Sequence, residues 1–295
     1  MGWPTRRTLT LVIVAAFGAA LVAVLATMPA ASALSANHGA SFAVRCDYSH
    51  RLPDDPIVRP GMEGAAHSHD FFGNTSTKFD STYGTMTAAP TTCEESHPED
   101  TAAYWMPTLS WDGEVRDSNR AVFYYRAGGK DHKRVKPFPA DLKLITADAG
   151  HISWRCGRAD NGKGSRNPPS QCGGGELGLR IIFPDCVDVD RNGQPVLDSD
   201  NHKSHMAYSR MRDGKVRCPR SHPRSVPVLT MNVTFPIPTT PGRVTLACDE
   251  ASPCGASTMH ADFWNTWNQA ELEHLVKRCI NNVPPSRPRP EECRA

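Results

Sequence analysis

Short runs of β-branched and aromatic residues, separated by turn-forming residues, are the main pattern along this chain. Glycine (22 residues) and proline (25 residues) are frequent, and stretches with helical periodicity are scarce. Such runs between turn signals are typical of β-strands. We therefore expect strands at Ala121–Tyr125, Leu142–Thr146, His151–Trp154, Leu179–Phe183, Val226–Phe235 and Val244–Leu246. Short strands joined by long loops predict a mainly β protein with a β-sandwich or jelly-roll-like core.

One helix is predicted near the C-terminus. Asn268 is a suitable N-cap, and Glu271 three residues later completes a capping-box pattern. An apolar face at helical spacing follows, made of Trp267, Leu272, Leu275, Val276, Cys279 and Ile280. Asn281, Asn282 and Pro284 are expected to end the helix. We expect Trp267 to pack in the core.

The N-terminus has the layout of a secretory signal peptide. Arg6 and Arg7 precede an apolar run over residues 9–26, and small residues follow at 31–33. We expect a signal peptide at 1–33, with cleavage after Ala33 or Ala36, although an uncleaved membrane anchor is the alternative. The mature chain is then secreted, with a single domain at 37–283 and a proline-rich tail at 284–295. We expect an extracellular monomer that has no membrane attachment after cleavage.

The chain has ten cysteines, and none of their spacings is C-x-x-C. An even cysteine count in an exported chain predicts disulfides, here five, and makes a zinc ribbon or a redox motif improbable. Cys248 and Cys254 flank a short loop that they could close, whereas Cys279 is expected to tie the helix to the body and Cys293 to pin the tail. The other pairings cannot be deduced from spacing.

The net charge of +2 is too small to indicate a nucleic-acid partner. The segment 210–224 is nonetheless basic, with six arginines and lysines. The favoured interpretation is a solvated surface loop. The alternative is attraction of an anionic polymer such as an acidic polysaccharide.

Six of the twelve histidines lie in four short polar segments: His67–Asn74, His202–Tyr208, Ser221–Pro223 and His260–Asn265. Histidine is a common metal ligand and an acid–base group near neutral pH. Four such segments far apart in sequence suggest loops that the fold brings together.

We assign candidate metal ligands to His67, His69 and His205. In an extended segment, His67 and His69 point to the same side, which suits two ligands of one ion, here a divalent metal as cofactor. His202 and His205 share a side only on a helical turn. The alternative is that these histidines are surface residues that stabilise loops.

The remaining candidates would act on a substrate. His260, Asp262, Tyr208 and His202 are the candidate catalytic residues, since a carboxylate beside an imidazole can orient it and raise its basicity. The candidate substrate-binding residues are Trp264, Trp105, Asn74 and His222. Structural roles are the alternatives, namely a buried hydroxyl for Tyr208 and core packing for the tryptophans.

Several mechanisms are excluded or disfavoured by missing motifs. The chain has no Gly-x-Ser-x-Gly nucleophile elbow, no His-Glu-x-x-His zinc-protease motif and no P-loop. The expected cleavage sites do not leave an N-terminal histidine, which counts against a copper-binding histidine brace.

The motifs together resemble a widespread family of secreted fungal and actinobacterial proteins, the domain-of-unknown-function family numbered nineteen ninety-six. The matching stretches are Asp55–Gly61, His67–Asn74, Tyr104–Pro107, Phe183–Cys186, His202–Tyr208, Cys218–Pro223 and His260–Trp267. After Cys186 the chain has Val187–Val189, where fungal members have a Trp-Asp-Gly turn. The resemblance implies a single extracellular domain, associated in fungi with cell-wall WSC modules, and brings no established reaction.

We therefore expect a secreted protein with a histidine-rich, metal-binding cleft that acts on extracellular or cell-wall polysaccharide as a hydrolase or lyase. A non-catalytic glycan-binding surface protein is the rival hypothesis, and metal scavenging is a third. The first requires imidazoles that converge on one site. The rival predicts histidines that are buried separately, each bonded to its own backbone carbonyl.

Overall fold

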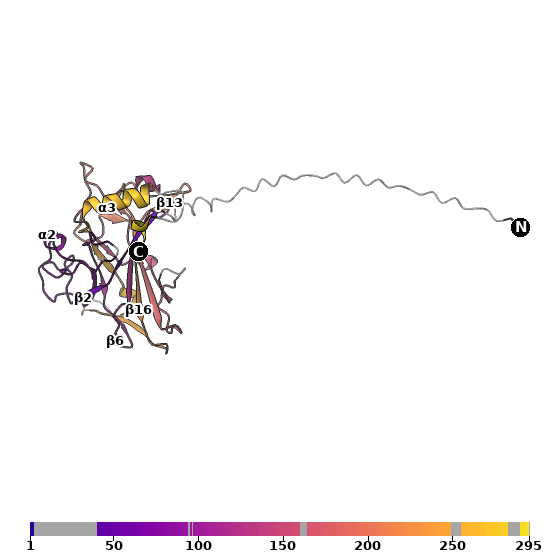
Figure 1. The fold of residues 1–295 in the computed structure, drawn as a ribbon, viewed down its shortest axis with the longest axis horizontal. Helices are drawn as coiled ribbons and strands as arrows, with labels where there is room; N and C mark the ends of the chain where they lie inside the picture. Colours follow the sequence, from indigo (N-terminus) through magenta and orange to yellow (C-terminus); the bar gives the residue numbers. More distant parts are fainter. Residues whose placement is uncertain are drawn as a thin grey trace.

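The computed structural model describes residues 1–2, 40–93, 95, 97–159, 164–248, 255–282 and 290–294. The expected cleavage sites, Cys254 and most of the proline-rich tail lie outside the described residues. Within the described residues the protein is built mainly of antiparallel strands, as the sequence pattern predicts (Figure 1).

The first large sheet has five strands in the order β1-β7-β16-β10-β9, and every neighbouring pair is antiparallel. Its members are β1 (Ser41–Cys46), β7 (Arg120–Arg126), β9 (Ile152–Cys156), β10 (Glu176–Ile182) and β16 (Val228–Pro236). Four of these strands were predicted from β-branched and aromatic runs, and β1 was not.

The second large sheet has the order β2-β3-β4-β18-β8. Its members are β2 (Tyr48–Leu52), β3 (His69–Gly73), β4 (Ala103–Pro107), β8 (Lys143–Thr146) and β18 (Ala261–Trp264). Of these, only β8 was among the predicted strand runs. The sheet is central to the site because β3 begins at His69 and β18 contains Asp262.

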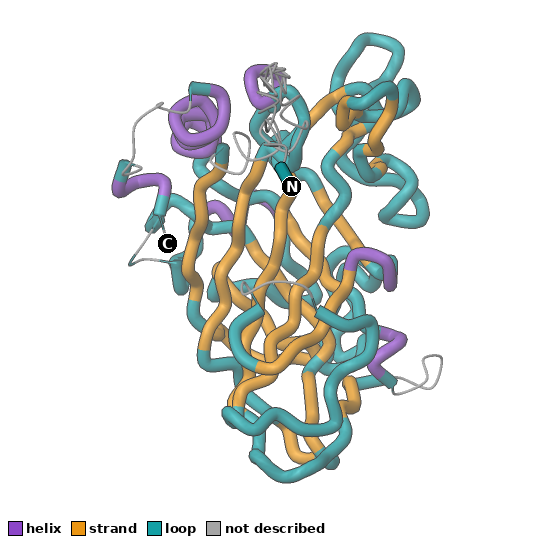
Figure 2. The backbone as a smooth tube through the Cα atoms, turned by 90° about the vertical axis from the view of Figure 1, so that its right-hand side faces the viewer, coloured by secondary structure: helices purple, strands orange, loops and turns teal. Residues whose placement is uncertain are grey.

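The two large sheets pack face to face as a β-sandwich. Phe123 of β7 stacks on Tyr104 of β4, with ring centroids 3.7 Å apart, and Phe183 lies 6.4 Å from Phe263 of β18. These rings belong to the main hydrophobic core, which takes alternate residues from both sheets. Figure 2 shows the strands running along the length of the body, with the helices at its periphery.

The second sheet is also covered on the face that points away from the main core. There Phe71, Trp105 and Trp264 form a separate apolar cluster with Ile57 from the β2–β3 connection and Met86 from the β3–β4 connection. The β3–β4 connection includes the short helix α2 (Tyr83–Thr87). Because this sheet is buried on both faces, its strands lack the alternation of polar and apolar residues that marks a half-exposed strand.

Small sheets complete the structure. One contains β5 (Leu109–Trp111), β6 (Glu114–Val115) and β17 (Val244–Leu246); another contains β11 (Cys186–Val187), β12 (Met206–Ala207) and β15 (Arg224–Ser225). The basic segment forms a hairpin of β13 (Arg210–Arg212) and β14 (Lys215–Arg217). Its turn, Asp213-Gly214, has positive φ at both residues, which suits the twist of a two-residue hairpin.

The predicted C-terminal helix is present as α3 (Gln269–Leu275), followed by π-helical turns at η4 (Val276–Asn281). Asn268 caps it by accepting bonds from Ala270 N and Glu271 N. The N–H of Asn268 donates to Glu99 O, so it is not used in the predicted capping box. Trp267 is buried in the core, as expected. Among the described residues, four short 3₁₀ turns lie at His132–Arg134, Ala149–His151, Ala256–Thr258 and Glu291–Cys293.

Four disulfides join described residues: Cys46–Cys93, Cys156–Cys172, Cys186–Cys218 and Cys279–Cys293. Cys248 is also disulfide-bonded. Cys279–Cys293 pins the tail, as expected of Cys293, but it joins Cys279 to the tail, whereas Cys279 was expected to tie the helix to the body. None of the helices in the described part of the chain has the length and apolar composition needed to cross a bilayer.

Candidate metal centre

Two strands of the second sheet carry the candidate site. β3 and β18 both pair with β4, so they lie on either side of it. Strand alternation places His69 on the same face as Phe71, and Asp262 on the same face as Trp264, which is the face away from the main core. His260 and His67 lie just before these strands. Side chains from both strands can therefore meet over β4.

Three histidines converge at this place. Ligand nitrogens of His67, His69 and His260 all lie within 4.8 Å of one another. The ring of His67 lies 4.3 Å from that of His69 and 5.0 Å from that of His260, between centroids. His69 is buried, whereas His67 and His260 are partly exposed. The group is thus closed on one side and open to solvent on the other.

Backbone carbonyls fix the tautomers of two of these rings. Nδ1 of His69 donates to Asp54 O at 2.9 Å, and Nδ1 of His260 donates to Thr258 O at 3.0 Å. Since a carbonyl can only accept, both Nδ1 atoms carry the hydrogen, and in the neutral rings both Nε2 atoms are electron-pair donors. These two Nε2 atoms face each other at 3.3 Å. Two acceptors at this distance repel unless a cation lies between them.

Protonation of His69 is a costly way to relieve that repulsion. Burial holds the pKa of His69 well below its usual value, and the neighbouring His260 and His67 lower it further. The imidazole of His69 therefore stays neutral at neutral pH. A metal ion would use the lone pairs that a proton cannot easily occupy.

A buried carboxylate completes the group. Asp262 is fully buried, and neither of its carboxylate oxygens has a hydrogen-bond partner among the described residues. Its Oδ2 lies 3.9 Å from Nε2 of His260. Burial raises the pKa of Asp262 well above its usual value, and nearby Asp55 adds to this rise. A bound cation would reverse the effect and supply the missing partner.

Two acidic residues shape the loop that leads to His67. Asp54 accepts bonds from Gly64 N and Phe79 N, and Asp55 accepts from Ile57 N and Val58 N. Asp55 also offers a ligand atom within 4.8 Å of those of His69 and Asp262. Burial raises the pKa of Asp55, and its bonds to Val58 and Ile57 act against that rise.

The 198–205 loop lies beside this group without adding a histidine to it. His205 is held separately: its Nε2 donates to Lys143 O at 2.7 Å, and its Nδ1 lies 2.9 Å from Ser199 Oγ. His202 is nearer, since it is among the groups that lower the pKa of Asp55, and Lys203 acts similarly on Asp262. His202 bonds through Nδ1 to Asp198 at 2.9 Å. It also has φ of 56°, which is uncommon for a residue other than glycine.

Two other predicted residues are bonded elsewhere. Tyr208 shares a 2.6 Å bond with Thr146 Oγ1, and its ring stacks on His151. Burial raises the pKa of Tyr208 to about 12. His222 bonds through Nε2 to Ser204 O at 3.0 Å. His205 and His222 are each bonded to a backbone carbonyl, which is what the rival hypothesis predicts for histidines that hold loops in place.

The candidate substrate-binding residues in the second sheet are buried. Trp105 has no exposed surface and Trp264 has 4% exposed, so neither offers a ring face to solvent. The Nε1 of Trp264 donates to Asp141, and Lys143 lies over its ring. The buried amide of Asn74 donates to Met86 O and Thr101 O, so it holds two loops together.

The sequence analysis did not single out Asp55 or Asp54 as site residues. Asp55 begins the first stretch of the family resemblance, and that was its only signal. His260 was assigned to catalysis, whereas the structure groups it with His67 and His69. The pairing joins positions 191 residues apart, which spacing in the sequence does not reveal.

Comparison with known proteins gives one match. The sequence model for the domain of unknown function DUF1996 matches residues 55–267, a range that contains every residue of the candidate metal centre. No curated protein and no solved structure matches the chain significantly. The match covers more than half of the chain, and the protein therefore belongs to the DUF1996 family.

Proposed function

We propose that His67, His69 and His260 bind a divalent transition-metal ion beside the buried carboxylate of Asp262, which leaves one position of the ion open, and that this centre serves hydrolysis or elimination on an extracellular polysaccharide. The observation that carries the metal assignment is the pair of Nε2 atoms, both fixed as electron-pair donors, that face each other at 3.3 Å.

The spacing suits such an ion. Metal–nitrogen distances of about 2.0–2.1 Å in a tetrahedral site separate two ligand nitrogens by about 3.4 Å. The 3.3 Å between His69 and His260 is close to this value. Imidazole ligands favour zinc, copper, iron or nickel over magnesium or calcium, which prefer oxygen. The backbone bonds at Nδ1 are the outer contacts that commonly orient metal-binding histidines.

The exposure of the ligands favours a reactive site over a purely structural one. Structural zinc sites are closed by four protein ligands, whereas catalytic sites keep a position open. Here His67 and His260 are partly exposed while His69 and Asp262 are buried. An ion held in this way would supply Lewis acidity to a bound oxygen atom.

His202 is the best placed group for proton transfer. Asp198 holds its Nδ1, and no described residue bonds its Nε2, which can act as the base in the arrangement in which a carboxylate orients an imidazole. Lys203 beside it adds a positive charge near Asp262 that would attract an anionic group. We assign no sugar-stacking role to the buried Trp105 and Trp264.

An extracellular setting and a polysaccharide substrate are part of the proposal. The four described disulfides suit an oxidising compartment. The charged and apolar pattern of residues 1–33 suits export. The substrate class rests on the extracellular setting and the absence of motifs for other common hydrolases.

Elemental analysis of the mature protein, purified without a histidine tag and incubated with zinc or copper, tests the metal assignment. We expect one ion per chain in the wild type and loss of that ion in His69→Ala and His260→Ala. The matched control is His222→Ala, which removes an imidazole outside the group and should leave the ion in place. A folded wild-type protein that binds no metal would refute the centre.

Activity is tested separately on a panel of neutral and acidic polysaccharides, with and without a chelator. We expect product release that the chelator abolishes and that His202→Gln reduces by about 10²-fold or more, as for loss of a general base. A metal-loaded protein that is inactive on the whole panel would leave the metal centre intact and favour a non-catalytic binding protein.

A further inference from the structure

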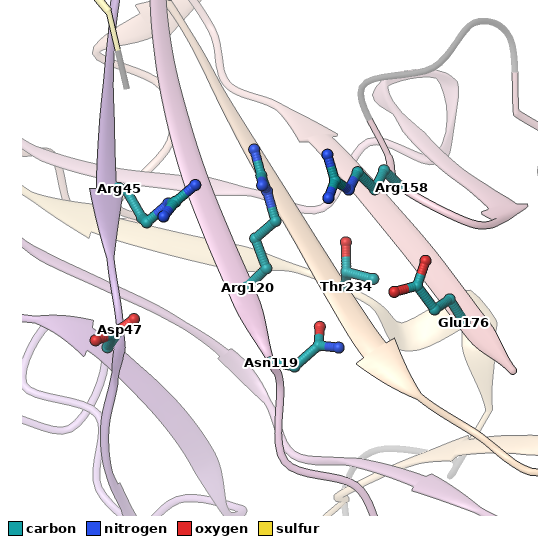
Figure 3. Close-up of a pocket in the computed structure, with 7 residues that line it drawn as sticks. All are labelled: Arg45, Asp47, Asn119, Arg120, Arg158, Glu176 and Thr234. Atoms are coloured by element: carbon teal, nitrogen blue, oxygen red, sulfur yellow. The ribbon is translucent and has the colours of Figure 1, made fainter.

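A second polar site lies on the opposite side of the sandwich. A hollow of about 230 Å³ opens on the first sheet, over β1, β7, β16 and β10 (Figure 3). Arg45 is exposed between the buried Val44 and Cys46, and Thr234 lies between core residues Val233 and Phe235. By strand alternation, Arg45 and Thr234 point away from the main core. The hollow is therefore separated from the candidate metal centre by the thickness of both sheets.

Three guanidinium groups gather at this hollow. Arg45 comes from β1, Arg120 from the start of β7 and Arg158 from the loop after β9. In Figure 3 the side chains of Arg45 and Arg158 extend toward Arg120 from opposite sides. Within the described parts of the chain, neither Arg120 nor Arg158 forms a side-chain hydrogen bond or an ion pair. Two guanidinium groups without such partners, next to a third, indicate a place for an anion.

The backbone around Arg158 is built to reach this place. Gly178 of β10 lies directly beneath the 157–159 segment, and a Cβ atom there would collide with Gly157 O and Ala159 N. The glycine thus lets the loop pass close over the sheet, which brings Arg158 to the hollow.

Further positive charge lies next to the hollow on the same face. Arg180 of β10 and Arg155 of β9 alternate with the core residues Leu179 and Trp154, so they point outward like Arg45. Arg180 donates to Asn232 Oδ1 at 3.4 Å. Four arginines from the strands and Arg158 from a loop therefore lie over one face of this sheet.

The other lining groups narrow the class of ligand. Asp47 and Glu176 lie at the sides, and Asn119 and Thr234 add an amide and a hydroxyl. Guanidinium groups bind carboxylates in forked pairs, and carboxylate and amide oxygens accept bonds from sugar hydroxyls. An anion with few hydroxyl groups would meet repulsion from Asp47 and Glu176 without gaining hydroxyl contacts to them. The mixture suits a ligand with both a carboxylate and hydroxyl groups.

We propose that this hollow binds a uronic acid residue of an acidic polysaccharide, with Arg45, Arg120 and Arg158 holding its carboxylate and Asp47, Asn119 and Glu176 its hydroxyls. The site is independent of the metal centre. It retains the protein on an acidic polymer, whatever reaction the metal centre serves.

Isothermal titration with polygalacturonate tests this proposal, and methyl-esterified polygalacturonate is the matched ligand without the charge. We expect binding of the first and not of the second at about 0.15 M salt, where diffuse attraction is largely screened. The double variant Arg120→Gln/Arg158→Gln should lose affinity by at least about tenfold, since it removes two charge-assisted contacts. If it does not fold, the exposed Arg158→Gln alone serves the same purpose.

The control is Arg210→Gln/Arg212→Gln, which removes the same charge from the exposed β13–β14 hairpin. This variant should bind as the wild type does. Three results would overturn the proposal: no binding of polygalacturonate, equal binding of the esterified polymer, or an equal loss in the hairpin variant. Metal content separates the two sites, because the Arg120→Gln/Arg158→Gln variant should keep its ion and His69→Ala should keep its affinity for polygalacturonate.

Discussion

The chemistry available to each histidine depends on which ring nitrogen donates a hydrogen bond to a backbone carbonyl. In His69 and His260 the carbonyl takes Nδ1 and leaves Nε2 for a ligand. In His205 the carbonyl of Lys143 takes Nε2, and the hydroxyl of Ser199 bonds Nδ1. All three histidines belong to motifs that the sequence analysis singled out. The sequence could not separate them, because the positions of the carbonyls follow from the folded backbone.

The pH dependence of stability should have a contribution from His97. This side chain is 5% exposed and lies against Phe42 and Trp267. Burial lowers the pKa of His97, while its bond to the backbone of Ala43 acts against this. Below a pH of about 6.5 the unfolded chain takes up a proton that the folded protein does not, so the free energy of unfolding falls as pH falls.

His97→Gln should therefore reduce the loss of stability between about pH 7.5 and pH 5.5, by up to about 1.4 kcal/mol per pH unit. Urea unfolding of both proteins at these two pH values measures the difference. Parallel pH profiles in the two proteins would contradict the assignment.

Four buried groups form a directed chain of hydrogen bonds. The indole of Trp267 can only donate, and it donates to Tyr125 Oη at 3.0 Å. The hydroxyls of Tyr125 and Tyr104 are 2.5 Å apart, and Tyr104 donates to Asp100 at 2.7 Å. If Tyr125 donates to Tyr104, every hydrogen in the chain has an acceptor, and Asp100 is the final one.

Tyr125→Phe should destabilise the protein by about 1–3 kcal/mol, because it leaves the buried Trp267 and Tyr104 groups without their partners. Thermal unfolding followed by circular dichroism measures this. Tyr83→Phe, on a partly exposed tyrosine of α2, is the control and should change stability by less than about 0.5 kcal/mol. An equally small effect for Tyr125→Phe would show that this series of hydrogen bonds contributes little to the free energy of unfolding.

At the scale of elements, the first sheet was the predictable part. Its strands β7, β9, β10 and β16 and the strand β8 of the second sheet are β-branched or aromatic runs between turns, and all were expected. The strands that carry the site, β3 and β18, are short and buried on both faces, and they contain His69, Asp70 and Asp262. Strands that are buried on both faces and contain polar residues show no alternating pattern. The sequence analysis therefore recognised these segments as histidine-containing motifs and did not list them as strands.

The C-terminal helical segment depends on a disulfide for its connection to the tail. Cys279 lies in η4 and is joined to Cys293, 14 positions later. Closing a loop of about 15 residues is worth about 3 kcal/mol. Cys279→Ala/Cys293→Ala should lower the free energy of unfolding by about this amount, measured by denaturant titration under non-reducing conditions. A change below about 1 kcal/mol would indicate that packing of α3 alone holds the segment.

At the scale of the whole molecule, metal binding should stabilise the fold. The ligands come from segments 191 residues apart, so an ion that binds them binds the folded chain only. With free metal at about 100 times its dissociation constant, the gain is about 2.7 kcal/mol. We expect a chelator to lower the melting temperature of the wild-type protein and to leave that of His69→Ala unchanged. Equal shifts in both proteins would place the stabilising ion elsewhere.

The two proposed sites face in opposite directions, since one lies on the outer face of the first sheet and the other on the far face of the second. A molecule that rests on a polymer by its arginines would turn its histidines outward. It could not easily cut the strand on which it sits. Its reach would extend to whatever lies on the other side, such as a neighbouring strand in a layered wall, and a film of such molecules would present an array of uniformly oriented metal sites.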